Sequence, residues 1–542
     1  MWAKVGSLLQ HEKFAWLDDI CRKQWVPVAA LGLFPVLILS HSLWQGAYNL
    51  DPHHWGLMLS NAKDLAVGKI PYQEIFIQYG LLTTIVHGAA YSLLGGNLQA
   101  LIGVTAFFYV VGLVGLYFLS LRAVASKKLA LFAYISACLL HPVAIYPWSN
   151  YIAFPFLVFG AWFFLAPGRQ VCNAFLAGVL FALAALCREG LMPAVFLFLL
   201  IASVAKPLLL KKSWRELVFE VFAVWGGLLL PLALFFLFLW RGGLIGYWYT
   251  TSVELPRLYV SALMPYGILG AVAKLAQFFV LEFLRFNPRV IFFALILGAS
   301  VVVTRLFFIA TGFLRSSANL VLMGAFSILL LSAALHGNEI FRLATSVAVG
   351  AGLVYWVASL RRFENLLFVA SSFLLLVSLG RGGDGNYFLP SRTQMGNSVV
   401  VETPVEFRGQ KWALEVQEFY QSLDRDMRTL KMEECGVRFF QNTTHDAFIS
   451  ALSPFSSYQV APFGNGPGWE RLRPEFDVQK RVAEDKDIAL FLKVSLVSAS
   501  DYLPPPGYAV ARRYVMPKVV FFEQGDTLLI VVPEICSGFL GQ

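Results

Sequence analysis

Long apolar runs constrain this chain more than any other feature of its sequence. They fill most of the chain up to residue 380, at 26–44, 97–121, 128–146, 151–166, 171–187, 190–209, 217–239, 288–311, 318–335, 343–360 and 364–379. Each run is near the length of a helix that crosses a bilayer, and in lipid a helix satisfies its own backbone polar groups. The expected fold is therefore an α-helical polytopic membrane protein with about eleven spanning helices.

The composition agrees with this expectation. Hydrophobic residues make up 58% of the 542 residues and charged residues 14%, against about 45–50% and 25% in soluble domains. The net charge of +9 does not indicate a nucleic-acid site, because the basic residues are scattered between the apolar runs. The sequence has no P-loop, G-x-S-x-G or H-E-x-x-H motif, which argues against an ATP-driven pump and the common hydrolases.

The distribution of Lys and Arg predicts the orientation of the chain. With residues 1–25 in the cytoplasm, sixteen Lys and Arg lie in inside loops or adjoining helix ends, and nine lie in outside loops before the tail. This assignment requires that 80–95 and 267–285 are interfacial helices that do not cross the membrane. The first external loop is then 45–96, and a second one spans 240–287.

The composition changes after the last apolar run. Residues 26–380 form the expected membrane module, and residues 381–542 are more polar and broken by turns, which predicts a soluble α/β domain. Apolar residues recur at helical spacing over 411–431, so an amphipathic helix is expected there. Cys435 and Cys536 lie in this tail, and the sequence leaves open a disulfide between them or two free thiols.

The first external loop is rich in groups that do chemistry. An ordinary connection between two spanning helices needs none of them. The loop carries Asp51, His53, His54, Lys63, Asp64, Tyr72, Glu74, Gln78 and Tyr79. A carboxylate such as Asp51 at the mouth of a helix bundle could take the proton of an acceptor hydroxyl. The alternative for Asp51 is a helix cap or a solvated acid of the loop.

The same loop raises the question of a metal. His53 and His54 could ligate a divalent ion together with Asp51, and Glu74 could complete such a site after folding. Adjacent histidines on a loop rarely point the same way, and no clear third ligand lies nearby in the sequence. The sequence leaves a divalent metal open and does not favour one, and it indicates no other cofactor.

The order of these loop residues resembles the first external loop of the GT-C glycosyltransferases, over roughly residues 45–122. An acidic residue follows the first membrane helix, and His-x-Gly, Pro-Tyr-x-acidic and Gln-Tyr-Gly follow in turn. The resemblance implies a polytopic enzyme that takes a sugar from a polyprenyl-phosphate carrier, with Asp51 as the general base.

The individual motifs match the family to different degrees. His54 and Gly56 match the His-x-Gly element, and Tyr72 and Glu74 match the Tyr-x-acidic element. Gln73 stands where a basic residue is usual in the family, so the resemblance implies no phosphate-binding role at that position. Some GT-C enzymes use a divalent ion and others do not, so the resemblance does not show whether this protein binds one.

Three further polar segments lie between apolar runs. Arg188 could hold the phosphate of the donor, or it could pair with Glu189 at a surface turn. His336, Glu339 and Arg342 resemble a cluster that GT-C enzymes place at the same entrance. Arg257 lies in an aromatic segment whose rings could anchor the chain at the membrane interface, or stack on sugars.

These observations favour an integral-membrane glycosyltransferase of the hexosyl or pentosyl type. The resemblance implies a bacterial inner-membrane enzyme that moves a sugar, with inversion, from a polyprenyl-phosphate carrier such as undecaprenyl phosphate to a hydroxyl on the periplasmic side. The acceptor would be a surface polysaccharide, O-antigen, lipopolysaccharide, another lipid or a protein. A glycolipid transporter or flippase is an alternative, and a non-catalytic subunit of polysaccharide assembly is another.

Overall fold

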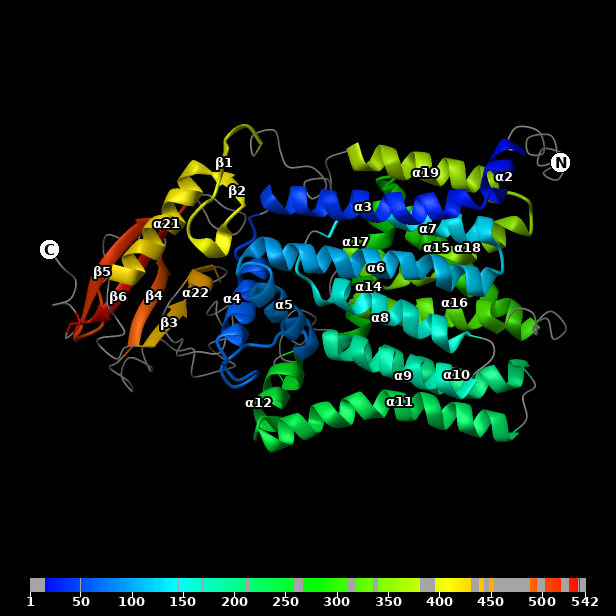
Figure 1. The fold of residues 1–542 in the computed structure, drawn as a ribbon, viewed down its shortest axis with the longest axis horizontal. Helices are drawn as coiled ribbons and strands as arrows, with labels where there is room; N and C mark the ends of the chain where they lie inside the picture. The colour runs from blue at the N-terminus through cyan, green and yellow to red at the C-terminus, as the bar shows by residue number, and fades with distance from the viewer. Residues whose placement is uncertain are drawn as a thin grey trace.

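The computed structural model describes residues 15–48, 50–144, 146–166, 170–210, 214–254, 256–257, 267–309, 318–334, 340–380, 395–429, 438–442, 448–452, 488–494, 503–517, 526–534 and 536. Most of these residues up to 380 form a bundle of long helices (Figure 1). The bundle contains α2 (Ala15–Arg22), α3 (Trp25–Tyr48), α6 (Leu98–Val124), α7 (Lys127–Leu140), α8 (Ser149–Phe164), α9 (Gln170–Cys187), α10 (Met192–Leu210), α11 (Trp214–Arg241), α15 (Pro288–Ile309), α16 (Ala318–Leu330), α18 (Ala351–Ser359) and α19 (Glu364–Gly380).

Each apolar run of the sequence overlaps one of these helices. The run at 343–360 is divided, because α17 (Ile340–Ala344) and the 3-10 turn η4 (Val347–Gly350) precede α18. Among the described residues, five helices are long and apolar enough to cross a membrane: Trp25–Tyr48, Leu98–Val124, Glu189–Lys206, Arg215–Arg241 and Pro288–Leu306. Shorter apolar helices, among them α8, α9, α16 and α19, complete the bundle.

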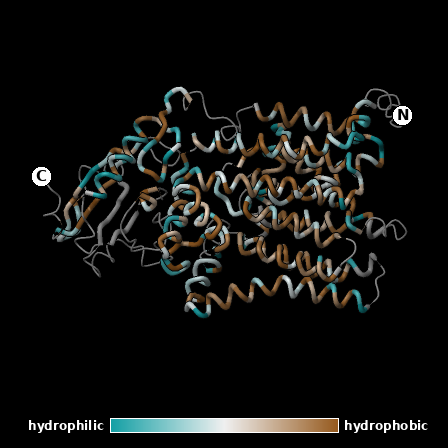
Figure 2. The backbone as a smooth tube through the Cα atoms, in the orientation of Figure 1, coloured by the Kyte–Doolittle hydropathy of each residue, from teal (hydrophilic) through white to brown (hydrophobic). Residues whose placement is uncertain are grey.

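The outer surface of the bundle is apolar. Phe222, Val204 and Leu234 are among many large apolar side chains that lie exposed on it, and the long helices are mostly brown in Figure 2. Water would disfavour so much exposed apolar surface, whereas lipid accommodates it. The chain is thus an integral membrane protein, as predicted.

Short helices gather at one end of the bundle. In Figure 1, α4 (His54–Ala66), α5 (Leu81–Leu93) and α12 (Ile245–Tyr249) lie between the bundle and the C-terminal strands, while the N-terminus lies at the opposite end. The five-residue π-helix η2 (Thr250–Glu254) follows α12, and α14 (Gly267–Leu284) packs against α15. The connections between α7 and α8 and between α9 and α10 also lie at the end that carries α4, because neighbouring helices run antiparallel.

The C-terminal part contains a mixed four-stranded sheet in the order β3-β4-β6-β5. β3 (Arg438–Asn442) pairs parallel with β4 (Ile488–Val494), and β6 (Thr527–Pro533) pairs antiparallel with both β4 and β5 (Tyr508–Val515). β1 (Ser398–Val400) and β2 (Lys411–Ala413) form a separate antiparallel pair, and α21 (Leu414–Thr429) and α22 (Phe448–Leu452) complete this part. α21 confirms the amphipathic helix expected at 411–431. Cys435 lies outside the described residues, so its pairing with Cys536 stays a prediction.

Helix α4 joins the C-terminal part to the bundle. Trp55 and Leu59 on α4 are fully buried in one apolar core with Trp412, Tyr420 and Phe448 of the tail. Apolar burial of this size holds the two parts together, at roughly 1.5–3 kcal/mol for each large side chain.

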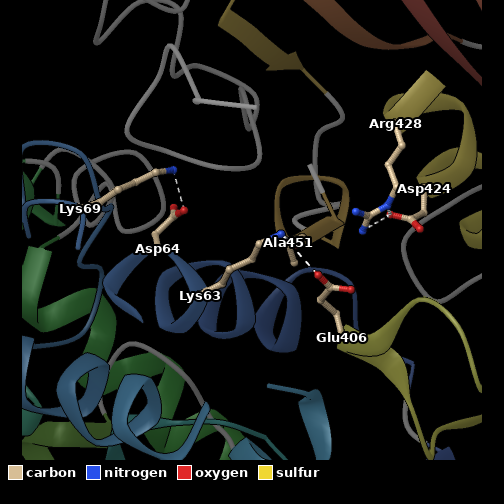
Figure 3. A network of polar contacts seen from close by, with 7 residues as sticks. All are labelled: Lys63, Asp64, Lys69, Glu406, Asp424, Arg428 and Ala451. Carbon is tan, nitrogen blue, oxygen red and sulfur yellow. Dashed lines mark hydrogen bonds and ion pairs between the residues drawn. The ribbon is translucent and has the colours of Figure 1, made fainter. Parts of the chain in front are cut away.

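Helix α4 also makes polar contacts with the tail (Figure 3). Lys63 Nζ donates to the carbonyl oxygen of Ala451 at 2.6 Å and lies 3.4 Å from a carboxylate oxygen of the buried Glu406. Asp64 pairs instead with Lys69, at 2.6 Å within the same loop region. The first external loop is therefore fastened to the tail through Lys63.

Candidate active site

The site begins with a carboxylate that is held at both oxygens. Asp51 is 4% exposed and lies three residues before the first residue of α4. Its Oδ1 accepts hydrogen bonds from the backbone N–H groups of His53 and His54, at 3.1 and 2.9 Å. Its Oδ2 lies 2.7 Å from Nδ1 of the His54 ring. Asp51 thus satisfies backbone donors at the start of α4, as the capping alternative expected, and it also holds an imidazole.

The electrostatics keep this carboxylate ionised. Burial alone would raise the pKa of Asp51, but the charge and hydrogen bonds of His54, aided by His53, outweigh burial and hold this pKa below its usual range. An ionised, buried carboxylate with three hydrogen-bond donors is fixed in position.

Aromatic rings surround the imidazole of His54. Its ring centroid lies 4.8 Å from that of Trp148, 5.4 Å from that of Tyr146 and 4.5 Å from that of His53. Tyr146 and Trp148 belong to the connection between α7 and α8, where Trp148 is the residue before α8. The connection between two membrane helices therefore forms a wall beside the Asp51–His54 pair.

Three more side chains, from the Gln-Tyr-Gly motif and from α17, contact the Trp148 ring. The ring of Tyr79, from the Gln-Tyr-Gly motif, lies 4.7 Å from the Trp148 ring. Phe341 stacks on the same indole at 5.4 Å, and the guanidinium of Arg342 lies over it at 4.7 Å. Arg342 is 5% exposed, so its charge is held in a desolvated position against an aromatic face.

The turn between α9 and α10 reaches the same region. Arg188 is 5% exposed, and its Nη1 donates to Oδ1 of Asn150, two residues after Trp148. The backbone N–H of Glu189 donates to the carbonyl oxygen of Tyr79 at 3.2 Å. The turn and the Gln-Tyr-Gly motif are therefore fastened to one another.

The packing around Gly80 explains why the Gln-Tyr-Gly motif ends in glycine. A Cβ atom at Gly80 would lie 2.5 Å from the carbonyl oxygens of Leu186 and Cys187, and the φ of Gly80 is +150°. Only a residue without a side chain fits so close to the end of α9. The close approach places Tyr79 beside the Arg188 turn.

A second hydrogen-bonded cluster lies around the Glu189 side chain. The hydroxyl of Tyr72 and the indole N–H of Trp248 both donate to Oε1 of Glu189, at 3.1 and 3.2 Å. Tyr72 is buried, with a positive φ of 66°. Burial and the neighbouring Glu189 carboxylate raise the pKa of Tyr72 well above its ordinary value. The cluster joins the first external loop, the α9–α10 turn and α12. Glu189 therefore does more than form a surface ion pair with Arg188, the role that the sequence left open for it.

The remaining predicted residues lie elsewhere. Glu74 and Gln78 are exposed, and Oε2 of Glu74 accepts from the backbone N–H of Ile70 at 2.7 Å in its own turn. Arg257 is exposed, and His336 and Glu339 lie outside the described residues. Within the described ranges, no three His, Cys, Asp or Glu residues gather as a group that could hold a metal ion.

The sequence interpretation missed the residues that connect the site. Trp148 and Asn150 lie between the apolar runs at 128–146 and 151–166 and were not identified as candidates, and Trp248 was included only as one aromatic residue of a segment. Pro147-Trp148-Ser149-Asn150 is polar and aromatic between two apolar runs, and this interruption is the signal that could have found them.

The comparisons with known proteins concern the fold. No family model and no curated protein matches this chain. The crystal structure of ArnT from Cupriavidus metallidurans in the apo state matches with a TM-score of 0.51 and 12% identity, over 92% of this chain and 98% of that chain. The archaeal oligosaccharyltransferase AglB from Archaeoglobus fulgidus, in complex with an inhibitory peptide and a dolichol-phosphate, matches with a TM-score of 0.49 and 12% identity, over 87% of this chain and 70% of that chain.

The match to ArnT extends over nearly the whole of both chains, helical bundle and C-terminal part together. It confirms the predicted fold class: the chain has a GT-C-like membrane fold.

Proposed function

We propose that this protein is a membrane glycosyltransferase that moves a sugar from a polyprenyl-phosphate carrier to an acceptor hydroxyl. One observation carries the proposal: His54, which the buried Asp51 holds, and the buried Arg342 both contact a single ring, that of Trp148. Proton transfer and phosphate stabilisation need these two kinds of group close together. The GT-C-like fold supports the proposal, since the loop motifs resemble those of GT-C enzymes.

In the proposed reaction the Asp51–His54 pair removes the proton of the acceptor hydroxyl. The acceptor oxygen then attacks the anomeric carbon opposite the phosphate, so the configuration at that carbon is inverted. Negative charge grows on the leaving phosphate, and the guanidinium groups of Arg342 and Arg188 stabilise it. Planar donors held in a desolvated position need no reorganisation as this charge develops.

The donor and the compartment follow from the topology. The bias of Lys and Arg places the N-terminus in the cytoplasm, and the site with the C-terminal part on the other side of the membrane. Nucleotide sugars are not expected there, so a lipid-linked sugar is the donor that this site can reach. We propose a bacterial inner membrane with the site in the periplasm. The acceptor is a surface polysaccharide, O-antigen, lipopolysaccharide or another glycoconjugate.

The test compares the masses of surface glycans and glycolipids in strains of the source organism. The strains are a deletion, the deletion with the wild-type gene, and the deletion with Asp51→Asn at matched membrane levels. The proposal expects a hexose- or pentose-sized increment that returns with the wild type and not with Asp51→Asn. His41→Asn serves as the control, since His41 also lies beside a tryptophan, Trp44, but on α3. Unchanged glycans in every strain contradict the proposal and favour transport.

A further inference from the structure

Both oxygens of the Asp51 carboxylate are already engaged. Oδ1 accepts from two backbone N–H groups, and Oδ2 accepts from the His54 ring at 2.7 Å. The Asp51 side chain is 6% exposed, whereas that of His54 is 21% exposed. An acceptor hydroxyl can therefore reach the imidazole more readily than the carboxylate behind it.

We propose that His54, through its Nε2 atom, is the general base of the transfer reaction, and that Asp51 is a positioning residue that holds His54. This assignment rests on the proposed glycosyl transfer and names the atom that takes the proton. It assigns to Asp51 a different role from the one that the family resemblance implies.

The hydrogen bond decides the tautomer of His54. An ionised carboxylate is only an acceptor, so the proton of a neutral imidazole lies on Nδ1, toward Asp51 Oδ2. The lone pair is then on Nε2, at the other side of the ring. A carboxylate whose pKa is held below its usual range is a weak base at neutral pH, whereas the histidine side chain is the group that most often serves as a general base.

The surroundings of His54 suit this role. Trp148 and Tyr146 pack against its ring, and the charge of Arg342 lies on the Trp148 ring. Among the described residues, Asp51, His53 and Tyr146 are titratable groups that contact His54. Of these, Asp51 favours the protonated imidazolium that forms when the base has taken a proton.

The proposed step balances without a further reactant. The acceptor O–H bond breaks and its proton moves to Nε2 of His54, while the acceptor oxygen forms a bond to the anomeric carbon. The bond from that carbon to the phosphate oxygen breaks, and its electron pair stays on the polyprenyl phosphate. The His54 imidazolium, stabilised by Asp51, then gives its proton to water.

The experiment measures sugar transfer in membranes of the deletion strain, which hold the native acceptor. The probes are tritium-labelled undecaprenyl-phosphate hexoses and pentoses, and rates are normalised to folded protein over a range of pH. His54→Asn keeps an N–H donor for Asp51, so it preserves the local fold while it removes the base. We expect its rate to fall by about 100- to 10,000-fold, the usual contribution of a general base. His41→Asn should transfer at the wild-type rate.

Two further variants distinguish a general base from a residue that has only a structural role. Added imidazole should restore part of the rate of His54→Ala. Asp51→Ala should keep a residual rate, with a loss in kcat that exceeds any change in KM, because the imidazole remains but is no longer held in position.

The assignment is overturned if folded His54→Asn transfers sugar at the wild-type rate while folded Asp51→Ala is inactive. In that case Asp51 is itself the base and the proposed function stands. A folded wild-type protein that transfers none of the labelled sugars overturns the proposed function, and this assignment with it.

Discussion

Helix α8 has a tryptophan under an arginine at each of its ends. Trp148 precedes its first residue and lies under Arg342, with 4.7 Å between the guanidinium carbon and the ring centroid. Trp162 lies in its last turn under Arg122, at 4.4 Å. The two pairs have nearly the same geometry, but they lie at opposite ends of the bundle.

Their surroundings differ. Trp148 also contacts His54 and Tyr79, which come from the first external loop. Trp162 contacts Phe159 and Phe163, which are neighbours on its own helix. Arg122 lies in the last turn of α6, where a cation interacts favourably with the helix dipole. The difference is that side chains from distant segments converge on Trp148, and the proposed function assigns a reaction site to that ring and a structural role to Trp162.

Replacement of the two arginines is expected to give the largest difference in transfer rate between the two ends of α8. Arg342→Gln should reduce the rate of sugar transfer by about 100- to 1,000-fold, as the loss of a charge-stabilising donor does in other enzymes. Arg122→Gln should change the rate by no more than about threefold, because surface cations contribute little. Initial rates from undecaprenyl-phosphate sugars check this prediction. Equal losses in the two variants would remove the distinction between the ends of α8.

A second pair of variants replaces the two tryptophan rings at the ends of α8. Trp148→Leu should lower kcat/KM by about 10- to 100-fold, since it removes aromatic and cation contacts of about 1 kcal/mol each from neighbours that include His54, Tyr79 and Arg342. Trp162→Leu should leave kcat/KM nearly unchanged and lower only the melting temperature. Kinetics and thermal unfolding of the same purified samples separate these effects. A purely structural role of Trp148 would show as a lower melting temperature with normal kcat/KM.

A smaller effect is expected where the first external loop meets α9. Gly80→Ala places a methyl group against two carbonyl oxygens, so we expect destabilisation by about 1–3 kcal/mol, as for other overpacked positions. Gly32→Ala on α3 is the matched control, because a Cβ there meets no atom within 4 Å. Melting temperatures in detergent check the prediction. A Gly80→Ala protein as stable as the wild type would mean that the loop can move away from α9.

The smallest effect is expected at the contact between α4 and the tail. Lys63→Met removes the contacts of Lys63 to Ala451 and Glu406 and should cost about 1 kcal/mol or somewhat more, because Glu406 is left buried. Lys69→Met, which removes only a pair with Asp64, should cost less. Limited proteolysis of the tail measures both. Equal protection in the two variants would show that the apolar core alone holds the tail.

The sequence predicted the parts of the molecule that depend on local patterns. Apolar runs predicted the helices, since each helix in lipid must satisfy its own backbone. Asp51 and His54 are three residues apart at the start of a helix, so their contact is also local. The structure contains the contacts to backbone N–H groups that the capping interpretation of Asp51 expected, whereas neither interpretation of Asp51 predicted its hydrogen bond to the His54 ring.

The convergence on Trp148 could not be predicted in this way. Arg342 lies almost two hundred positions after Trp148, and only the packing of α8 beside α17 brings them together. Lys63 and Ala451 are separated by 388 positions, so their hydrogen bond likewise follows from tertiary packing. Sequence reasoning identified Arg188 and Arg342 because charges between apolar runs are costly, but it had no means to place Arg188 beside Asn150 or Arg342 on the Trp148 ring.

The most direct test of the whole account is the release of polyprenyl phosphate by the purified protein in lipid nanodiscs. The protein is given undecaprenyl-phosphate sugars and an extract of the native acceptor, and the products are measured by mass spectrometry. The account predicts that one donor yields free undecaprenyl phosphate and an acceptor that has gained the sugar with inverted configuration, and that His54→Asn yields neither. Folded wild-type protein that leaves every donor intact, but moves it across the bilayer of a proteoliposome, would contradict the account.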